Sequence, residues 1–247
     1  MEFIGIIPAR YQSSRFPGKP LVDIHGKSMI HRVYEQCLKA KLNRVVVATD
    51  DERIFKHVLE FGGEVVMTSS KHESGTDRIA EGAKKLNLAA DIVIINIQGD
   101  EPFIDPTDIN ILADCFFDDS TEIATLIKPI NNSETLFNIN TPKVVLGQNK
   151  QALYFSREAI PHLRGIDKKE WLNKSFYFQH IGIYAYRNQT LQTISKLPMG
   201  DLERSEGLEQ LRWLENSYTI KTAITQSECI AVDSPEDLEK IDKKFFS

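Results

Sequence analysis

The sequence predicts an α/β fold with a doubly wound, mostly parallel sheet and an inserted smaller lobe. Short runs of β-branched and apolar residues alternate with segments whose apolar residues recur at helical spacing, which is the order of strands and crossover helices in a parallel sheet. The chain has 247 residues, 41% of them hydrophobic, and can therefore bury a full core. Because no Pro-, Gly- or Ser-rich linker divides it, we expect one domain over residues 1–247.

The first half of the chain contains the elements with the clearest patterns. Strands are expected at residues 3–7, 44–48, 64–67 and 92–97. Apolar residues at a 3.6-residue spacing predict crossover helices around residues 29–38, 54–59 and 79–86. A capping side chain followed by proline marks two further helix starts, at Asp105 and at Ser234.

The pattern changes after about residue 131. Strands are expected at 143–147 and 178–186, and a charged, irregular stretch at 165–174 lies between them. We interpret residues from about 131 to 200 as a lobe inserted within the domain and not as a domain of its own.

The C-terminal part is expected to return to the main sheet. A helix at 205–213 precedes two further expected strands, at 218–224 and 229–232. The chain has no internal repeat and no low-complexity tract.

Charge and cysteine content narrow the class of protein. A net charge of −5 argues against a protein that binds nucleic acid without regard to sequence, which would need clustered Lys and Arg. The three cysteines form no CxxC pair and suggest neither a zinc site nor a disulfide framework: Cys37, Cys115 and Cys229. No run approaches the roughly 20 apolar residues that span a membrane, and the first residues lack the basic start of a signal peptide. We expect a cytoplasmic protein with no membrane partner.

The loop after the first expected strand carries three cations, Arg10, Arg15 and Lys19, on a backbone bent by Gly18 and two prolines. Loops at the carboxyl ends of parallel strands lie where such sheets bind ligands, and cations and backbone N–H groups there can surround phosphate oxygens. We predict a polyphosphate-binding loop. It matches neither the P-loop nor the G-x-G-x-x-G fingerprint, and the alternative is a solvated basic surface loop.

Two aspartates each follow an expected strand. Asp100 comes after the run at 92–97, and Asp233 follows the run at 229–232. Magnesium prefers one or two carboxylates together with phosphate oxygens and water, so the pair predicts a magnesium site beside the polyphosphate loop. The alternative is that these side chains cap the helices that follow, although Asp105 and Ser234 are better placed for capping.

Residues 69–78 predict a tight loop that opens the third crossover helix. Its small residues allow a planar ligand to approach the backbone, Thr76 is expected to cap the helix, and a helix start favours an anion. The alternative is a simple turn in which Asp77 and Arg78 form an exposed charge pair.

The loop at 6–21 resembles the signature loop of sugar nucleotidyltransferases, and eight segments together resemble the 3-deoxy-manno-octulosonate (KDO) cytidylyltransferase family. The segments, in chain order, are 10–24, 47–50, 72–78, 96–102, 152–157, 180–186, 208–212 and 232–238. The resemblance spans nearly the whole chain, but residues 165–174 do not align with the family pattern. It implies a Rossmann-like nucleotidyltransferase fold and a homodimer formed through the inserted lobe.

The resemblance also implies roles for individual residues. Catalysis would fall to Arg10, Arg15, Lys19 and Asp100. The first three of these would hold the triphosphate, and Asp100 and Asp233 would bind magnesium. CTP would contact Ala9, Arg10, Lys19, Ser74, Arg78 and Gln98, with Ser74 and Arg78 near the cytosine. The sugar acid would be bound by Gln98, Arg157, His180, Tyr184, Glu209 and Gln210.

Several of these residues have a structural alternative. His180 in an apolar strand is also typical of a core histidine with a hydrogen-bond partner, and Arg157 of a surface pair. We expect four large aromatic side chains to lie in the core or at an interface and not in the site: Tyr154, Trp171, Tyr186 and Trp213.

The resemblance implies transfer of CMP from CTP to the anomeric hydroxyl of KDO, with release of pyrophosphate, for lipopolysaccharide biosynthesis. Other nucleotidyltransferases of the same fold remain alternatives, such as CMP-sialate synthetase or an enzyme acting on sugar 1-phosphates. A non-catalytic module that senses CTP would keep the loop but would not need both Asp100 and Asp233. A dinucleotide-dependent oxidoreductase is disfavoured, because the first loop lacks the close-packed glycines that such enzymes need.

Overall fold

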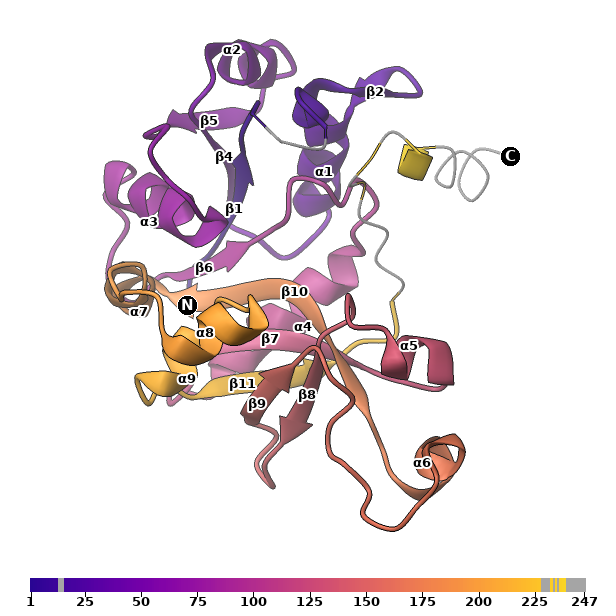
Figure 1. The fold of residues 1–247 in the computed structure, drawn as a ribbon. Helices are drawn as coiled ribbons and strands as arrows, with labels where there is room; N and C mark the ends of the chain where they lie inside the picture. Colours follow the sequence, from indigo (N-terminus) through magenta and orange to yellow (C-terminus); the bar gives the residue numbers. More distant parts are fainter. Residues whose placement is uncertain (13–15, 228–231, 233, 235, 239–247) are drawn as a thin grey trace.

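The computed structural model describes residues 1–12, 16–227, 232, 234 and 236–238 (Figure 1). Within them, nine strands form one sheet, whose main path runs β11-β7-β10-β6-β1-β4-β5. The strands are β1 Phe3–Ala9, β4 Arg44–Thr49, β5 Glu64–Met67, β6 Val93–Asn96, β7 Ile123–Pro129, β8 Lys143–Leu146, β9 Ala152–Ser156, β10 Phe178–Arg187 and β11 Ile220–Ile224. A separate hairpin consists of β2 Asp23–Ile24 and β3 Lys27–Ser28.

The helices fill the connections between the strands. They are α1 Met29–Leu38, α2 Glu52–Glu60, α3 Gly75–Lys85, α4 Pro106–Asp114, α5 Ser133–Phe137, α6 Trp171–Lys174, α7 Asn188–Ile194, α8 Asp201–Glu206 and α9 Gln210–Glu215, with short 3₁₀ turns η1 Lys19–Leu21, η2 Cys115–Phe117 and η3 Lys168–Glu170. None of the helices in the described part of the chain has the length and apolar character to cross a bilayer.

The α/β fold is confirmed, and the first half follows the prediction closely. β6, β1, β4 and β5 are parallel neighbours, joined through α1, α2 and α3. Only β10, which pairs antiparallel with both β6 and β7, departs from the parallel arrangement along the main path. The expected cap at Asp105 is confirmed, because its carboxylate accepts the N–H of Thr107 at 2.8 Å.

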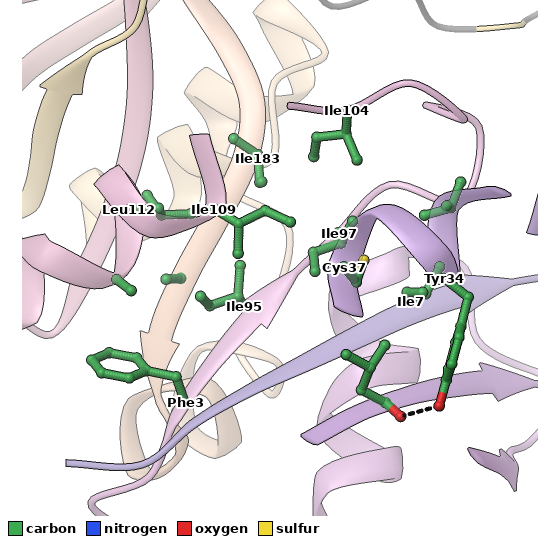
Figure 2. Packing of buried hydrophobic residues seen from close by; sticks show 14 of the residues in the cluster. Phe3, Ile7, Tyr34, Cys37, Ile95, Ile97, Ile104, Ile109, Leu112 and Ile183 are labelled. Carbon is green, nitrogen blue, oxygen red and sulfur yellow. Dashed lines mark hydrogen bonds between the residues drawn. The ribbon is translucent and has the colours of Figure 1, made fainter. Parts of the chain in front are cut away.

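Two buried clusters cover the two faces of the sheet. Alternate residues of β1 divide between them, with Phe3 and Ile7 in one and Ile4 and Ile6 in the other. The first cluster includes buried residues of α1, α2 and α4, and the second those of α3, α7 and α9. Figure 2 shows the first cluster, in which the Tyr34 hydroxyl donates to the carbonyl of Val45 at 3.1 Å. Helices on both faces make this a doubly wound sheet.

The second half shows where the sequence pattern was insufficient. β7, buried along most of its length, was not predicted, and it lies between β10 and β11. The predicted helix at 205–213 is wrong as one element, because Gly207 adopts φ +63° and separates α8 from α9. The strand predicted at 218–224 is shortened to β11, and most of 229–232 lies outside the described residues.

Residues 131–200 contribute both to the sheet and beyond it. β10 is an inner strand of the main sheet, and β8 pairs with β10 and with β9. Between β9 and β10 the chain forms an arm that carries α6 and projects away from the sheet (Figure 1). Trp171 anchors this arm, being 2% exposed in a small cluster with Ile130, Leu136 and Tyr177.

Candidate active site

A cleft of about 260 Å³ opens at the carboxyl end of β1 and β6, beside the first turn of α3. Seven of the sequence-predicted site residues line it: Ala9, Arg10, Lys19, Ser74, Arg78, Gln98 and Asp100. The remaining lining residues are Pro8, Pro20, His72, Glu73, Gly75 and Gly99. Two predicted residues, Arg15 and Asp233, lie outside the described residues. The structure therefore brings one predicted group together in a single concave surface.

Backbone geometry brings Lys19 over the cleft. Gly18 has φ +77°, which favours glycine, and its N–H donates to the carbonyl of Tyr11 at 2.8 Å. A Cβ on Gly18 would lie 3.1 Å from the Tyr11 ring, so the two segments of the loop pack directly on one another. The guanidinium carbon of Arg53 lies 3.2 Å from the centre of the Tyr11 ring.

Lys19 and Asp100 form an ion pair across the cleft. The Lys19 Nζ lies 2.7 Å from Asp100 Oδ2, and the two side chains are 15% and 29% exposed. The pair joins the loop after β1 to the loop after β6, which are neighbours because β1 and β6 are paired. A cation and a carboxylate thus meet at the point where the sequence predicted phosphate and metal binding.

The donor set at Asp100 fits magnesium in part. Its carboxylate reaches the cleft, and the adjoining Val232 donates its N–H to the Asp100 carbonyl at 2.9 Å. In the described part of the chain no three His, Cys, Asp or Glu side chains gather as a metal-binding group. Magnesium in nucleotide sites commonly takes one or two carboxylates and fills its remaining positions with phosphate oxygens and water, so one described carboxylate in a cationic cleft is compatible with it.

The start of α3 differs from the prediction in its capping residue. Ser74 is the N-cap, and its hydroxyl accepts the N–H of Asp77 at 3.1 Å. Thr76 was wrongly predicted as the cap: it is 3% exposed, and its hydroxyl donates to Glu209 Oε2 at 2.8 Å. A residue predicted to stabilise the helix locally thus connects it to a segment more than 130 positions away.

Arg78 is not part of an exposed charge pair. The residue is 3% exposed, its Nη1 donates to Thr68 Oγ1 at 2.7 Å, and its Nη2 donates to Asp50 Oδ2 at 2.9 Å. The alternative of a solvated Asp77–Arg78 pair is wrong, because Asp50 at the end of β4 takes this role.

The loop after β6 also contacts β10. Gln98 Nε2 donates to the carbonyl of Gly182 at 3.1 Å, where the pairing of β10 with β7 shifts register between Ile181 and Tyr184. At the adjacent Gly99 a Cβ would lie 2.9 Å from the carbonyl oxygen of Pro8, so only glycine allows this approach to β1. Gln98 therefore lies between the cleft and the second half of the sheet.

His180 is held in its neutral form. Burial lowers its pKa to about 3. Its Nε2 lies 3.0 Å from Thr125 Oγ1, while the single proton of that hydroxyl is available to the carbonyl of Ile183 at 2.8 Å. We therefore assign the imidazole proton to Nε2, which leaves Nδ1 as an acceptor.

Tyr184, Glu209 and Gln210 form a buried polar group beside His180. The Tyr184 and His180 rings lie 5.3 Å apart, and the Tyr184 hydroxyl makes no hydrogen bond within the described chain. The same holds for Gln210 Nε2, at the first residue of α9. Burial raises the pKa of Glu209, and it also raises that of Tyr184 well above its ordinary value. Buried polar atoms without partners in the protein are candidates for binding a polar ligand.

Arg157 has a structural role in this conformation. Its Nε donates to the carbonyl of Glu206 at 2.6 Å, and its Nη1 and Nη2 donate to the carbonyls of Ile139 and Gly207 at 3.1 and 3.3 Å. The guanidinium therefore fixes the break between α8 and α9 at Gly207, two residues before Glu209. A surface ion pair is not what the structure shows for this residue.

Sequence reasoning missed the residues that support the predicted ones. Asp50 and Thr68 hold Arg78, and Thr125 orients His180. Asp50 and Thr68 directly follow β4 and β5, so the rule that drew attention to Asp100 would have found them. Tyr186 and Trp213, predicted to lie in the core or at an interface, are buried in the core, and the Trp213 ring lies 5.1 Å from that of Tyr184.

Comparison with known proteins agrees with this architecture. The cytidylyltransferase family profile matches residues 4–224. The chain is 57% identical over 244 residues to the 3-deoxy-manno-octulosonate cytidylyltransferase of Parabacteroides distasonis, covering 97% of this chain and 96% of the relative. It is 54% identical over 242 residues to the protein of the same name from Bacteroides thetaiotaomicron, with coverage of 97% and 96%.

Solved structures give the same result for the fold. A structure of CMP:2-keto-3-deoxy-manno-octonic acid synthetase in complex with CTP superposes with a TM-score of 0.90 at 43% identity, covering 98% of both chains. A thymidylyltransferase-like structure from Bacillus anthracis reaches a TM-score of 0.66 at 17% identity, covering 98% of this chain and 94% of its own, which indicates a shared fold alone.

Proposed function

The chain belongs to the 3-deoxy-manno-octulosonate cytidylyltransferase family, and from this premise we propose that it transfers CMP from CTP to KDO with release of pyrophosphate. The observation that carries the proposal is the cleft at the ends of β1 and β6, where Lys19 and Asp100 meet. Cationic and carboxylate groups at one point suit a metal-bound triphosphate better than a neutral ligand.

The triphosphate of CTP is proposed to lie along the loop after β1. Arg10, Arg15 and Lys19 would neutralise its charge, and the backbone at Ala9 would approach the nucleotide. Arg10 and Lys19 support this because both line the cleft. Ser74, Arg78 and Gln98, which also line the cleft, would contact the cytidine.

KDO is proposed to bind between the cleft and β10. Gln98 would lie between the two substrates, and His180, Tyr184, Glu209 and Gln210 would pair with the sugar hydroxyls. Unpaired buried atoms on Tyr184 and Gln210, together with the acceptor Nδ1 of His180, support this placement. Arg157 would act on the carboxylate of the sugar acid, directly or through the segment that it holds.

Asp100 and Asp233 are proposed to hold Mg²⁺. When bound, the ion would neutralise charge on the α-phosphate and on the leaving pyrophosphate. The protein's proposed contribution to the reaction is positioning and charge: Lys19 and Arg10 would hold the phosphates in line, and the sugar-binding residues His180, Tyr184, Glu209 and Gln210 would orient the anomeric hydroxyl towards the α-phosphorus. This direct displacement needs no covalent enzyme intermediate.

The setting of the reaction is also part of the proposal. We place the enzyme in the cytoplasm as a homodimer formed through the segment at about 131–200, with its product used for lipopolysaccharide. Supporting the interface, Phe176 on the arm, Leu153 on β9 and Ile139 in the segment between α5 and β8 are 88%, 56% and 57% exposed. Sedimentation of the protein should give the mass of a dimer, and Phe176→Ser should shift it towards the monomer.

Pyrophosphate release tests the activity. The protein is incubated with CTP and Mg²⁺ in the presence of KDO or of a sialic acid, and each sugar is omitted as a blank. Release with KDO alone is expected. Release with the sialic acid instead would retain the nucleotide site and overturn the sugar assignment, and no release with either would favour a module that only senses CTP.

A further inference from the structure

Arg78 is a cleft residue whose guanidinium is held by hydrogen bonds to two other side chains, Thr68 and Asp50. Its side chain is 4% exposed and that of Asp50 is 16% exposed, so the ion pair is largely buried. Arg78 lines the cleft, whereas Asp50 and Thr68 do not. The two partners therefore hold the guanidinium without themselves lining the cleft.

These partners come from rigid parts of the sheet. Asp50 follows β4 directly and Thr68 follows β5, and the Thr68 N–H donates to the carbonyl of Thr49 at 2.7 Å. Since β4 and β5 are paired and α3 carries Arg78 itself, three elements fix the guanidinium. A long side chain that loses this support would recover several rotamers.

Asp50 also determines which kind of ligand group the Arg78 guanidinium favours. The carboxylate neutralises the guanidinium charge at a buried position, which leaves directed N–H donors with little net charge. Such a group favours a neutral acceptor. Lys19 and Arg10, which line the same cleft, provide the charge that suits phosphate. The lining thus combines charged groups with a neutralised donor.

The N–H donors of Arg78 that make no hydrogen bond within the described chain can pair with only some nucleobases. Within the described chain, Nε–H and one hydrogen on Nη2 make no hydrogen bond. Cytosine presents two adjacent acceptors, O2 and N3, whereas uracil presents a donor at N3. A buried donor facing another donor loses its hydrogen bond, and sites built on such pairs discriminate strongly.

We propose that Asp50 and Thr68 are positioning residues for nucleobase selection, because they hold the Arg78 guanidinium as a neutralised donor for the acceptor edge of cytosine. The inference rests on the proposed cytidylyltransferase function. It adds that discrimination between CTP and UTP depends on two residues that do not line the cleft.

The test compares kcat/KM for CTP and for UTP, with KDO saturating, in the wild type and in Asp50→Asn, Asp50→Ala and Thr68→Val. For Asp50→Asn we expect kcat/KM for CTP to fall about tenfold to 100-fold, mainly through KM, and kcat/KM for UTP to change less than about threefold. Thr68→Val should reduce the CTP preference in the same direction by about three- to tenfold.

Glu64→Gln is the matched control. Glu64 on β5 pairs with Arg44 at the opposite end of β4, where the Arg44 Nε donates to Glu64 Oε2 at 2.7 Å. Breaking that pair should lower the melting temperature and leave the CTP-to-UTP ratio unchanged.

If kcat/KM falls equally for CTP and UTP, and the fall parallels a loss of melting temperature, the inference is wrong and Asp50 has only a structural role. If the Asp50 variants do not fold, Thr68→Val decides alone: an unchanged ratio contradicts the inference. Failure of the proposed function is distinguishable, because the wild type would then release no pyrophosphate from CTP and KDO.

Discussion

Single side chains in this protein have protonation states that their surroundings determine. His180 is the clearest case, because burial lowers its pKa to about 3 and Thr125 accepts the Nε2 proton. A neutral imidazole with an acceptor at Nδ1 can accept the proton of a sugar hydroxyl, whereas an imidazolium can only donate. At neutral pH the ring therefore acts by hydrogen bonding and not by charge.

The lowered pKa of His180 predicts how stability changes with pH. An unfolded histidine titrates near pH 6.5, so between about pH 6.5 and 3 the unfolded state binds a proton that the folded state does not. The contribution of neutral His180 to the free energy of unfolding is complete above pH 6.5 and is lost as the pH falls towards 3. Relative to His180→Gln, the free energy of unfolding of the wild type should drop by up to about 1.4 kcal/mol per pH unit between pH 6 and 4. Parallel curves in urea denaturation would contradict this.

The Lys19–Asp100 pair predicts two different kinetic effects. Lys19→Ala should raise KM for CTP about tenfold to 100-fold and change KM for KDO little, because it removes a cation from the triphosphate end. Asp100→Ala should reduce kcat below detection, because it removes a proposed magnesium ligand. Both variants should remain folded, because neither the Lys19 nor the Asp100 side chain is fully buried.

The control for these variants is Asp118→Ala. Asp118 pairs with Lys221 at 2.6 Å, and neither residue lines the cleft. Steady-state kinetics should show that this variant retains wild-type constants. An unchanged KM for CTP in Lys19→Ala would exclude the loop from triphosphate binding.

At the scale of an element, the loop from β1 to η1 depends on a left-handed glycine packed against an aromatic ring. Gly18 and Gly26 provide a matched pair, because their φ angles are +77° and +78°. At Gly18 a Cβ would meet the Tyr11 ring at 3.1 Å, whereas at Gly26 it would meet nothing within 4 Å. The backbone cost of alanine is thus similar at the two sites, and only the contact differs.

Gly18→Ala should therefore impair CTP binding, and Gly26→Ala should not. Each variant should lose about 1 to 2 kcal/mol of stability from the left-handed backbone. Only Gly18→Ala should also raise KM for CTP, about three- to tenfold, because the displaced Tyr11 ring shifts the segment that carries Lys19. Thermal denaturation and CTP saturation curves measure the two effects separately, and equal KM values in the two variants would contradict the loop argument.

Local patterns predicted the elements that local residues determine. The apolar spacing of α1 gave both of its ends correctly, and the β-branched runs located β1, β4, β5 and β6. The helix at 205–213 was wrong although Gly207 stood within it, because glycine in a helical pattern indicates an end only when the backbone turns left-handed. Thr76 was read as a cap because its actual partner, Glu209, is distant in sequence.

At the scale of the whole molecule, the sheet joins two halves that sequence reasoning treated separately. β10 pairs with β6, so the proposed sugar-binding residues on β10 lie near the end of β6, where the loop with Gln98 and Asp100 begins. Resemblance supplied the residues of the candidate site, but the partners that orient them, such as Asp50 and Thr125, depend on strand order. Strand order follows from long-range pairing that a local pattern does not contain.

Thr76 provides a test of contact between the halves. Its hydroxyl reaches Glu209 from the helix whose N-cap, Ser74, lines the cleft. Thr76→Val keeps the shape and removes the hydrogen bond, and it should raise KM for KDO and KM for CTP together, each by about three- to tenfold. Thr76→Ser retains the hydroxyl and should behave like the wild type. A change confined to the KM for KDO would mean that the bond serves Glu209 alone.

The Thr76–Glu209 hydrogen bond joins the helix beside the cleft to a proposed sugar-binding residue, and this has a thermodynamic consequence. If nucleotide strengthens the binding of the sugar acid through Thr76 and Glu209, the cycle of binding steps requires the sugar acid to strengthen the binding of nucleotide by the same factor. Titration of KDO with and without CDP, and of CDP with and without KDO, would yield equal factors. Either substrate, arriving first, would then prepare the protein to capture the other, and neither order of addition would be compulsory.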